Sequence, residues 1–264
     1  MLPALFGEES CVTTGITALQ SICFRAFQSF FPYRPSIGGD ECACRLTHGC
    51  KWKNCFLIHS GLWGLVNNAG IGFSAPIEWT PLEKSKHIAD INMWGMIDVT
   101  KTFLPLVKKA RGRVVNISSV VGRVSPPNTS SYCVTKYGVQ AFSDALRREM
   151  APWGVQVSII EPGLFKTALA NEERQIQVLQ EFWDGLSLEL KEEYGERKLN
   201  QVKQGVSKSC RMASSETSKV VNAIIDALTS QRPQTRYSVD LDGKLFIFIS
   251  FLPTFIADFF FRNV

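Results

Sequence analysis

The chain has 264 residues, of which 45% are hydrophobic and 20% are charged, and its formal net charge is +5. This size and composition fit one globular α/β domain with a sizeable hydrophobic core. The positive charge forms no long block of lysine and arginine, so a solvated basic surface is favoured and a nucleic-acid partner is not.

Eight cysteines are present, and six of them precede residue 56: Cys11, Cys23, Cys42, Cys44, Cys50 and Cys55. The first residues, MLPALFGEES, contain no basic stretch and only a short apolar run, which argues against a signal peptide and a secreted disulfide framework. Reduced thiols in a cytosol-facing protein are the favoured interpretation. The spacing from Cys42 to Cys55 does not match the paired ligands of structural zinc sites, so no metal site is predicted. A metal or redox module in residues 1–60 stays as a minor alternative.

Residues 1–60 show little periodic pattern. Ile16 to Phe31 is apolar with polar interruptions, and it is too short and too polar for a membrane span. Its pattern indicates an amphipathic helix, either buried or lying on a membrane. Pro32 to Cys55 has a mixed composition without a period, so low order is expected there.

The pattern becomes regular at Leu62. Leu62 to Val66 is a short apolar run that predicts a buried strand, and the small-residue turn Asn67-Asn68-Ala69-Gly70 follows it. Small residues at this turn allow a flat ring or a ribose to lie against the backbone. An ordinary strand-ending turn is the alternative interpretation.

A long helix is predicted from about Ile88 to Val107. Just before it, Thr80 and Glu83 have the spacing of a capping box, with Thr80 as the N-cap of a helix. Asn92 lies among apolar neighbours in the long helix, and a buried amide must find hydrogen-bond partners. The amide is interpreted either as a satisfied core group or as a functional one.

The segment from Arg113 to Lys136 carries the strongest chemical signal. Arg113 to Ser119 predicts a buried strand that ends in the Ser119 hydroxyl. Tyr132 and Lys136 have the spacing that puts both side chains on one face of the helix predicted from Tyr132 to Met150. A fixed ammonium beside a phenol favours the phenolate, so this pair fits a proton-transfer device.

The inward stripe of the Tyr132–Met150 helix is predicted to comprise Ala141, Phe142, Ala145 and Leu146. A further strand is predicted from Val155 to Ile160, and Glu161-Pro162-Gly163 follows it. Strands that alternate with helices through short links predict a parallel sheet.

The region from Ala168 to Ser215 is polar and is predicted to be helical. Its apolar residues Phe182, Trp183 and Leu186 either line an apolar pocket or pack onto the body of the domain. Val220 to Leu228 predicts a further helix.

The most hydrophobic segment runs from Leu245 to Phe261. It contains Pro253 and Asp258 and is short for a membrane span. It is interpreted either as an element that lies on a membrane surface or admits an apolar substrate, or as a terminal strand and helix packed on the domain.

Four stretches resemble the short-chain dehydrogenases/reductases, in particular their retinol and hydroxysteroid dehydrogenase branch: GLWGLVNNAGI, LPLVKKARGRVVNISSVVGRVS, AFSDALRREM and EPGLFKT. The resemblance runs from Gly61 to the C-terminus and does not cover residues 1–60. It implies a Rossmann-like α/β fold with a doubly wound parallel sheet. It also implies a catalytic region at residues 61–264, with a helical substrate lid at about 168–215 and a hydrophobic tail at 245–261.

The resemblance implies reversible hydride transfer between a nicotinamide cofactor, NAD or NADP, and an apolar alcohol, ketone or aldehyde such as a retinoid or hydroxysteroid. Tyr132 would exchange the hydroxyl proton, and Lys136 would lower its pKa and bind the nicotinamide ribose. The implied catalytic residues are Asn92, Ser119, Tyr132 and Lys136. The implied cofactor-binding residues are Asn67, Ala69, Gly70, Tyr132, Lys136, Pro162, Gly163 and Thr167.

The N-terminal part of this fold is expected to be incomplete. It requires a strand, a glycine-rich turn and a helix whose N-terminus faces the pyrophosphate. Thr13-Thr14-Gly15 is the one hint of that turn, and Ile16 to Arg25 contains no further glycine. Cofactor binding is therefore expected to be weakened or lost. A truncated, non-catalytic relative that serves at most as an interaction partner stays as the alternative function.

The branch further implies a location at the endoplasmic reticulum membrane, with the cytoplasm as the alternative. Contact with a membrane surface through the 245–261 tail is expected under the first location. The residues indicate neither a choice between NAD and NADP nor an oligomeric state.

Overall fold

The computed structural model describes residues 61–261, with the backbone alone at positions 241 and 242. Residues Leu62–Val264 form one compact unit. The interpretations of Thr13-Thr14-Gly15, of a helix at Ile16–Phe31, of low order at Pro32–Cys55 and of a cysteine-rich module all lie outside the described residues.

Four strands form one sheet in the order β1-β2-β3-β4, and every neighbouring pair is parallel. The strands are β1 (Gly64–Asn67), β2 (Arg113–Ile117), β3 (Gln156–Glu161) and β4 (Arg236–Ser238). The predicted parallel sheet and its first three strands are confirmed, but β1 is half-buried and not buried as predicted. The short strand β4 was not predicted, because its three residues carry no apolar run; Tyr237 is the one that it buries.

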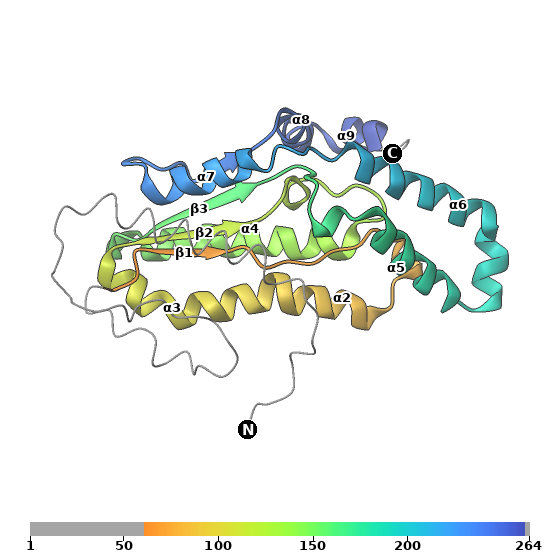
Figure 1. Cartoon of the computed structure of the whole chain (residues 1–264), viewed down its shortest axis with the longest axis horizontal. Coiled ribbons are helices and arrows are strands. Elements are labelled where there is room, and N and C mark those ends of the chain that lie inside the picture. The colour runs from red at the N-terminus through yellow and green to blue at the C-terminus, as the bar shows by residue number, and fades with distance from the viewer. Residues whose placement is uncertain (1–60, 262–264) are drawn as a thin grey trace, which may run out of the picture. The chain divides into compact units, whose positions relative to one another are not determined.

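Helices cover both faces of the sheet. Helices α3 (Met96–Ala110) and α4 (Ser130–Met150) pack on one face, and α7 (Ser218–Thr229) packs on the other (Figure 1). The core between α3, α4 and the sheet consists of fully buried aliphatic side chains: Val107, Val114, Leu146, Val155 and Val157. The described residues therefore have the layers of a Rossmann-like fold.

The long helix predicted at Ile88–Val107 is divided in the structure. It consists of α2 (Leu82–Ala89), a π-helical turn at Asp90–Gly95 and α3. Single π-helical turns inside helices are frequent at functional sites, and this one contains Asn92.

The predicted capping box is wrong. Pro81 is the N-cap of α2 and makes no side-chain cap. The Thr80 hydroxyl instead donates to the Pro76 carbonyl at 2.8 Å, across the 3-10 turn that precedes it, and Glu83 pairs with Lys86 at 2.8 Å. The Thr80 hydroxyl is therefore bonded across the 3-10 turn Ile77–Trp79 and does not cap α2.

The inward stripe of α4 differs in part from the prediction. Leu146 is buried and Phe142 is half-buried, but Ala141 and Ala145 are exposed. The buried face is mostly polar and comprises Cys133, Thr135, Lys136, Val139, Gln140, Ser143 and Leu146. The prediction placed the apolar residues inward, but this helix buries mainly polar side chains and exposes Ala141 and Ala145.

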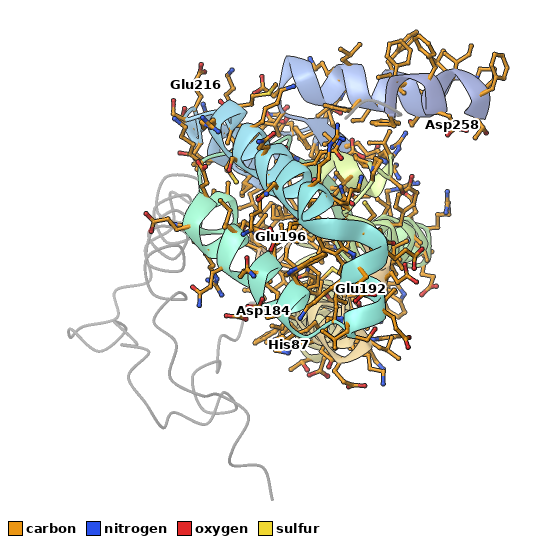
Figure 2. The ribbon with its side chains drawn as sticks, turned by 90° about the vertical axis from the view of Figure 1, so that its right-hand side faces the viewer. His87, Asp184, Glu192, Glu196, Glu216 and Asp258 are labelled. Atoms are coloured by element: carbon orange, nitrogen blue, oxygen red, sulfur yellow. The ribbon has the colours of Figure 1, made fainter. Side chains whose placement is uncertain are left out.

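The segment after β3 is helical, as predicted, and its role as a substrate lid stays a prediction. It comprises α5 (Glu172–Asp184) and α6 (Leu188–Met212), and α6 is kinked where Gly195 has a φ of 68°. Figure 2 shows Asp184, Glu192 and Glu196 on the outward side of these helices, which agrees with their exposure. The prediction of a helix at Val220–Leu228 is confirmed by α7.

The hydrophobic end of the chain forms two short helices, α8 (Leu241–Ser250) and α9 (Thr254–Phe261), and no strand. One side of α8 packs inward, where Gly243 and Ile249 are buried. Figure 2 shows mostly carbon side chains around the labelled Asp258 of α9. Within residues 61–261, no helix is both long and apolar enough to cross a membrane.

Candidate active site

The predicted catalytic residues meet at the carboxyl ends of the parallel strands. Ser119 follows β2, the Pro162-Gly163 pair follows β3, and α4 brings Tyr132 and Lys136 to the same edge. In open α/β sheets, ligands bind in the crevice at this edge. The topology thus gathers side chains that are far apart in the sequence.

Ser119 is held in a fixed orientation. Its side chain is buried, and its backbone is extended with a φ of −168°. The hydroxyl donates to the Pro162 carbonyl at 3.2 Å and accepts from the Val121 amide at 3.3 Å. It lies near enough to the Tyr132 phenol to lower the pKa of that group. The hydroxyl and the phenol therefore lie near each other at this edge, and their convergence on one substrate oxygen stays a prediction.

Lys136 is buried beside the phenol. It is 4% exposed, and its Nζ donates to the Ile117 carbonyl at 2.9 Å. The same nitrogen lies 5.5 Å from the centroid of the Tyr132 ring. Burial disfavours the charged form and lowers the pKa of Lys136 from 10.5 to about 8.

The prediction that Lys136 lowers the pKa of Tyr132 is wrong for the chain by itself. Burial raises the pKa of the phenol well above its ordinary value of 10, and the neighbouring Cys133 raises it further. The nearby Ser119 hydroxyl lowers this pKa by less. The ammonium, bonded to Ile117, does not offset the loss of solvation.

Asn92 is a satisfied buried amide that holds the loop beside the lysine. It is 2% exposed, its Oδ1 accepts from the Ile71 amide at 2.8 Å, and its Nδ2 donates to the Ile71 carbonyl at 2.8 Å. Nδ2 also lies 3.2 Å from the Thr135 hydroxyl oxygen. A role for Asn92 in proton relay stays a prediction.

We expect Asn92→Ala to lower the free energy of unfolding by roughly 2–4 kcal/mol, since buried donors and acceptors at Ile71 and Thr135 would lose their partner. Urea denaturation of the purified chain measures this change. Asn200→Ala, at an exposed position of α6, is the matched control and is expected to change stability by less than about 0.5 kcal/mol. Equal effects of the two substitutions would show that the Asn92 bonds contribute nothing specific.

The Asn67–Gly70 turn contributes backbone rather than side chains to the site. The Asn67 amide donates to Thr100 Oγ1 at 2.9 Å and to Asn116 Oδ1 at 2.8 Å, so it is used in packing α3 on the sheet. Ala69 and Gly70 are exposed. A Cβ atom at Gly70 would lie 3.7 Å from Lys136 Nζ, so the backbone of this turn runs directly beside the lysine.

Gly72 is a site residue that the sequence reasoning missed. A Cβ atom there would lie 2.9 Å from the Tyr132 ring, which leaves no room for a side chain. The spacing Gly70-Ile71-Gly72 was the available signal. The glycine allows the loop backbone to lie against the phenol.

The predicted cofactor residues after β3 occupy different environments. The Pro162 carbonyl accepts from the Val120 amide at 3.0 Å and from Ser119, so it belongs to the catalytic cluster. A Cβ atom at Gly163 would lie 3.9 Å from the Gly243 amide of α8. Thr167 is exposed at the start of the 3-10 turn Ala168–Ala170 and is not brought into contact with the cluster.

Gln175 is a second residue that the sequence reasoning missed. It extends from α5 of the lid, its Oε1 accepts from the Ser74 amide at 3.2 Å, and its Nε2 donates to the carbonyls of Gly72 at 3.0 Å and Leu169 at 2.8 Å. One side chain therefore joins α5 to the Gly72–Ser74 loop, which packs against Tyr132, and to the Leu169 carbonyl before the helix. A lone glutamine on a polar helix carries no sequence signal for this role.

The aromatic side chains of the lid pack onto the domain body. Phe182 lies edge-on to Phe73 with ring centroids 4.9 Å apart, and Trp183 lies edge-on to Trp79 at 4.9 Å. Phe182 and Trp183 are buried, and Leu186 packs against the same cluster. The packing alternative is confirmed for these residues.

The nicotinamide half of a cofactor fits the described residues. The buried Lys136 ammonium has three donors and uses one on Ile117, so it has donors for ribose hydroxyls beside the Gly70 backbone. Residues 1–60, in which the sequence lacks the glycine-rich phosphate turn of the family, lie outside the described residues. No group of three or more metal-ligating side chains occurs among residues 61–261.

Comparison with known proteins gives concordant results. The family model described as short chain dehydrogenase matches residues 53–177. Retinol dehydrogenase 16 of Mus musculus is 47% identical over 210 residues, which cover 79% of this chain and 66% of that protein. Mitochondrial D-beta-hydroxybutyrate dehydrogenase of Rattus norvegicus is 46% identical over 179 residues, 67% of this chain and 52% of that protein. The chain thus spans 66% and 52% of the lengths of these relatives.

Two solved structures share the fold. A short chain dehydrogenase from Burkholderia cenocepacia J2315, in complex with NADP, has a TM-score of 0.56 and 17% identity and covers 76% of this chain and 68% of its own. A short-chain dehydrogenase from Streptomyces avermitilis has a TM-score of 0.54 and 26% identity. The match covers 72% of this chain and 64% of that protein.

Proposed function

This chain belongs to the short-chain dehydrogenase family, and on that premise we propose that it transfers a hydride between a nicotinamide cofactor and an alcohol or carbonyl substrate. The observation that carries the proposal is the convergence of the Ser119 hydroxyl, the Tyr132 phenol and the buried Lys136 ammonium at one strand edge. A fold hosts many functions, so the proposal depends on this cluster.

The cofactor site in this proposal uses both backbone and side chains. When bound, the nicotinamide ring supplies or accepts the hydride. Lys136 would donate to the ribose hydroxyls, and the backbone at Ala69-Gly70 and Pro162-Gly163 would lie beside the bound cofactor. Thr167 is proposed to bond the carboxamide, which requires its segment to approach the cluster. The residues favour neither NAD nor NADP.

The proton chemistry in this proposal centres on Tyr132. Its raised pKa keeps the phenol protonated at neutral pH, so it donates a proton to the substrate oxygen as a carbonyl is reduced. In alcohol oxidation, the same oxygen takes the hydroxyl proton. Ser119 donates a hydrogen bond to the substrate oxygen and stabilises its developing negative charge. Asn92 is proposed to support proton relay through the loop that it holds at Ile71.

The proposed substrate is an apolar alcohol or its carbonyl form, of the retinoid or hydroxysteroid type. Its support is the 46–49% identity to proteins named retinol dehydrogenase. The proposed tests add retinol, a hydroxysteroid or 3-hydroxybutyrate to the purified full chain with NAD or NADP and follow absorbance of the reduced cofactor. Turnover of retinol or the steroid supports the proposal. Turnover of 3-hydroxybutyrate alone would retain hydride transfer and refute the apolar substrate.

Absence of turnover with every pair, together with no cofactor binding, would favour the alternative function. The chain would then be a non-catalytic relative that serves at most as an interaction partner. The two functions predict the same fold for residues 61–261, so only binding and turnover separate them.

We also propose that the tail formed by α8 and α9 lies on a membrane surface, at the endoplasmic reticulum. Its exposed aromatic side chains include Phe248 at 60%, Phe255 at 74% and Phe259 at 70% exposure. Exposed aromatic and aliphatic side chains of this kind insert at the boundary between headgroups and acyl chains.

Replacing Phe248, Phe255 and Phe259 together by serine is expected to lower the fraction of chain that sediments with phospholipid vesicles by about fivefold or more. The control replaces Ile77 and Leu188, which are 73% and 77% exposed on other elements, and is expected to leave sedimentation unchanged. If sedimentation fell equally in both variants, vesicle binding would result from general surface hydrophobicity. If it did not fall in the triple phenylalanine variant, the proposed contact between the tail and the membrane would be refuted.

A further inference from the structure

Glu161, the last residue of β3, is a buried carboxylate with partners on three other segments. It is 1% exposed, and it accepts hydrogen bonds from Gln140 Nε2 at 2.8 Å, from Arg123 Nη1 at 3.2 Å and from Ser238 Oγ at 3.1 Å. Arg236 Nε lies 3.7 Å from the same carboxylate. A buried charge is tolerated only when it is paired and bonded in this way.

Two of these partners, Gln140 and Arg123, belong to segments that carry part of the catalytic cluster. Gln140 lies one turn after Lys136 on the buried face of α4. Arg123 ends the 3-10 turn Val120–Gly122, which begins directly after Ser119. The carboxylate therefore joins the helix that carries the phenol and lysine to the turn that carries the serine.

The backbone of Glu161 continues this connection. The next residue is Pro162, whose carbonyl accepts from the Ser119 hydroxyl at 3.2 Å and from the Val120 amide at 3.0 Å. The direction of the Ser119 hydroxyl thus depends on where the end of β3 lies. A displacement of that end would move the hydroxyl away from Tyr132.

We propose that Glu161 is a positioning residue for hydride transfer: its carboxylate fixes α4, the Ser119 turn and the Pro162 carbonyl in one arrangement. This role rests on the proposed dehydrogenase function. Glu161 acts through these segments and touches neither the phenol nor the lysine in the hydrogen bonds described above.

Asp144 provides a matched control within the same charged group. It lies on α4 and pairs with Arg236, at 2.7 Å. Its other ionic partner, Arg147, lies on α4 itself, so Asp144 does not join α4 to the Ser119 turn or to Pro162. Asp144→Asn removes a negative charge that shares Arg236 with Glu161 and leaves the bonds of Glu161 to Gln140 and Arg123 in place.

The test compares Glu161→Gln with Asp144→Asn in the full chain. Glu161→Gln keeps the side-chain shape but presents an NH₂ group to donors, and we expect kcat to fall roughly 10- to 100-fold while KM for the alcohol changes less than about threefold. Asp144→Asn is expected to keep kcat within about twofold while lowering the thermal midpoint. An unchanged kcat in Glu161→Gln would overturn the proposal.

Hydrogen–deuterium exchange of the chain without cofactor supplies an independent readout. We expect the amide of Val120, bonded to Pro162, to exchange faster in Glu161→Gln and at the wild-type rate in Asp144→Asn. If the wild-type chain shows no turnover, the proposed function fails, and exchange at Val120 still decides the positioning role. Exchange of the Val120 amide at the wild-type rate in Glu161→Gln would overturn that role.

If Glu161→Gln does not fold, Gln140→Met is used in its place, because it removes one donor to the carboxylate. We expect kcat to fall and the Val120 amide to exchange faster in this variant too.

Discussion

Tyr132→Phe is expected to reduce kcat by about 10²- to 10⁴-fold, the usual contribution of a positioned proton donor. The substitution removes the one hydroxyl that exchanges a proton with the substrate in the proposed mechanism. The ring stays in place against Gly72, so cofactor binding and the thermal midpoint are expected to change little. Steady-state turnover with the best alcohol substrate measures the effect.

The control for this substitution is Tyr137→Phe. Tyr137 lies on the same helix, α4, but is 43% exposed. We expect it to retain kcat within about twofold, as surface substitutions generally do. If Tyr132→Phe kept near-normal turnover, the proton would have to come from another group, and the proposed role of the phenol would be refuted.

Lys136→Met is expected to weaken nicotinamide binding by about tenfold or more and to reduce turnover to a similar extent, because it removes charge-assisted donors to the ribose. Titration of the purified chain with NADH, followed by fluorescence, measures the binding. Lys101→Met, at an exposed position of α3, is the control and is expected to bind as the wild type does. Equal binding by the Lys136 and Lys101 variants would remove the lysine from the cofactor site.

The same lysine gives a pH dependence of stability in the chain without cofactor. Its pKa is lowered from 10.5 to about 8 by burial, so between these values the unfolded chain binds more protons than the folded chain. Stability therefore rises with pH from about 8 toward 10.5. The full cost of the buried charge, on the order of 3 kcal/mol, applies below pH 8.

Urea denaturation at pH 7 and at pH 10 tests this dependence. We expect the free energy of unfolding of Lys136→Met to lack the rise that the wild type gains from this group. The raised pKa of Tyr132 acts in the opposite direction only above its ordinary value of 10, and it is common to both proteins. An identical pH profile for the two proteins would contradict the buried charge.

Much of the fold could be predicted from the sequence because its signals are local. The apolar runs at β1, β2 and β3 predicted the three strands, and the spacing of Tyr132 and Lys136 predicted that both lie on one helix, α4. Ser119 follows a strand and Tyr132 lies near the start of a helix. Both lie at the same edge of the sheet, because the carboxyl ends of parallel strands share one edge.

The remaining features depend on contacts between distant segments. Gln175 lies on a polar helix and Glu161 ends an apolar strand, and only the folded structure brings Gly72 to one and Gln140 to the other. The pKa of Tyr132 depends on burial, which the sequence spacing does not report, so its direction was predicted wrongly. Apolar counting likewise placed Ala145 inward, although the helix buries Ser143 instead.

Binding of NADH to the purified full chain tests the central claim most directly, because the proposed dehydrogenase function needs a cofactor held beside Lys136. The proposed function predicts saturable binding below about millimolar cofactor for the wild type, weaker than with a glycine-rich turn, and a marked loss for Lys136→Met. No binding up to about millimolar cofactor would contradict the proposed function. The chain would then be a relative that has Ser119, Tyr132 and Lys136 in place but does not bind the nicotinamide cofactor.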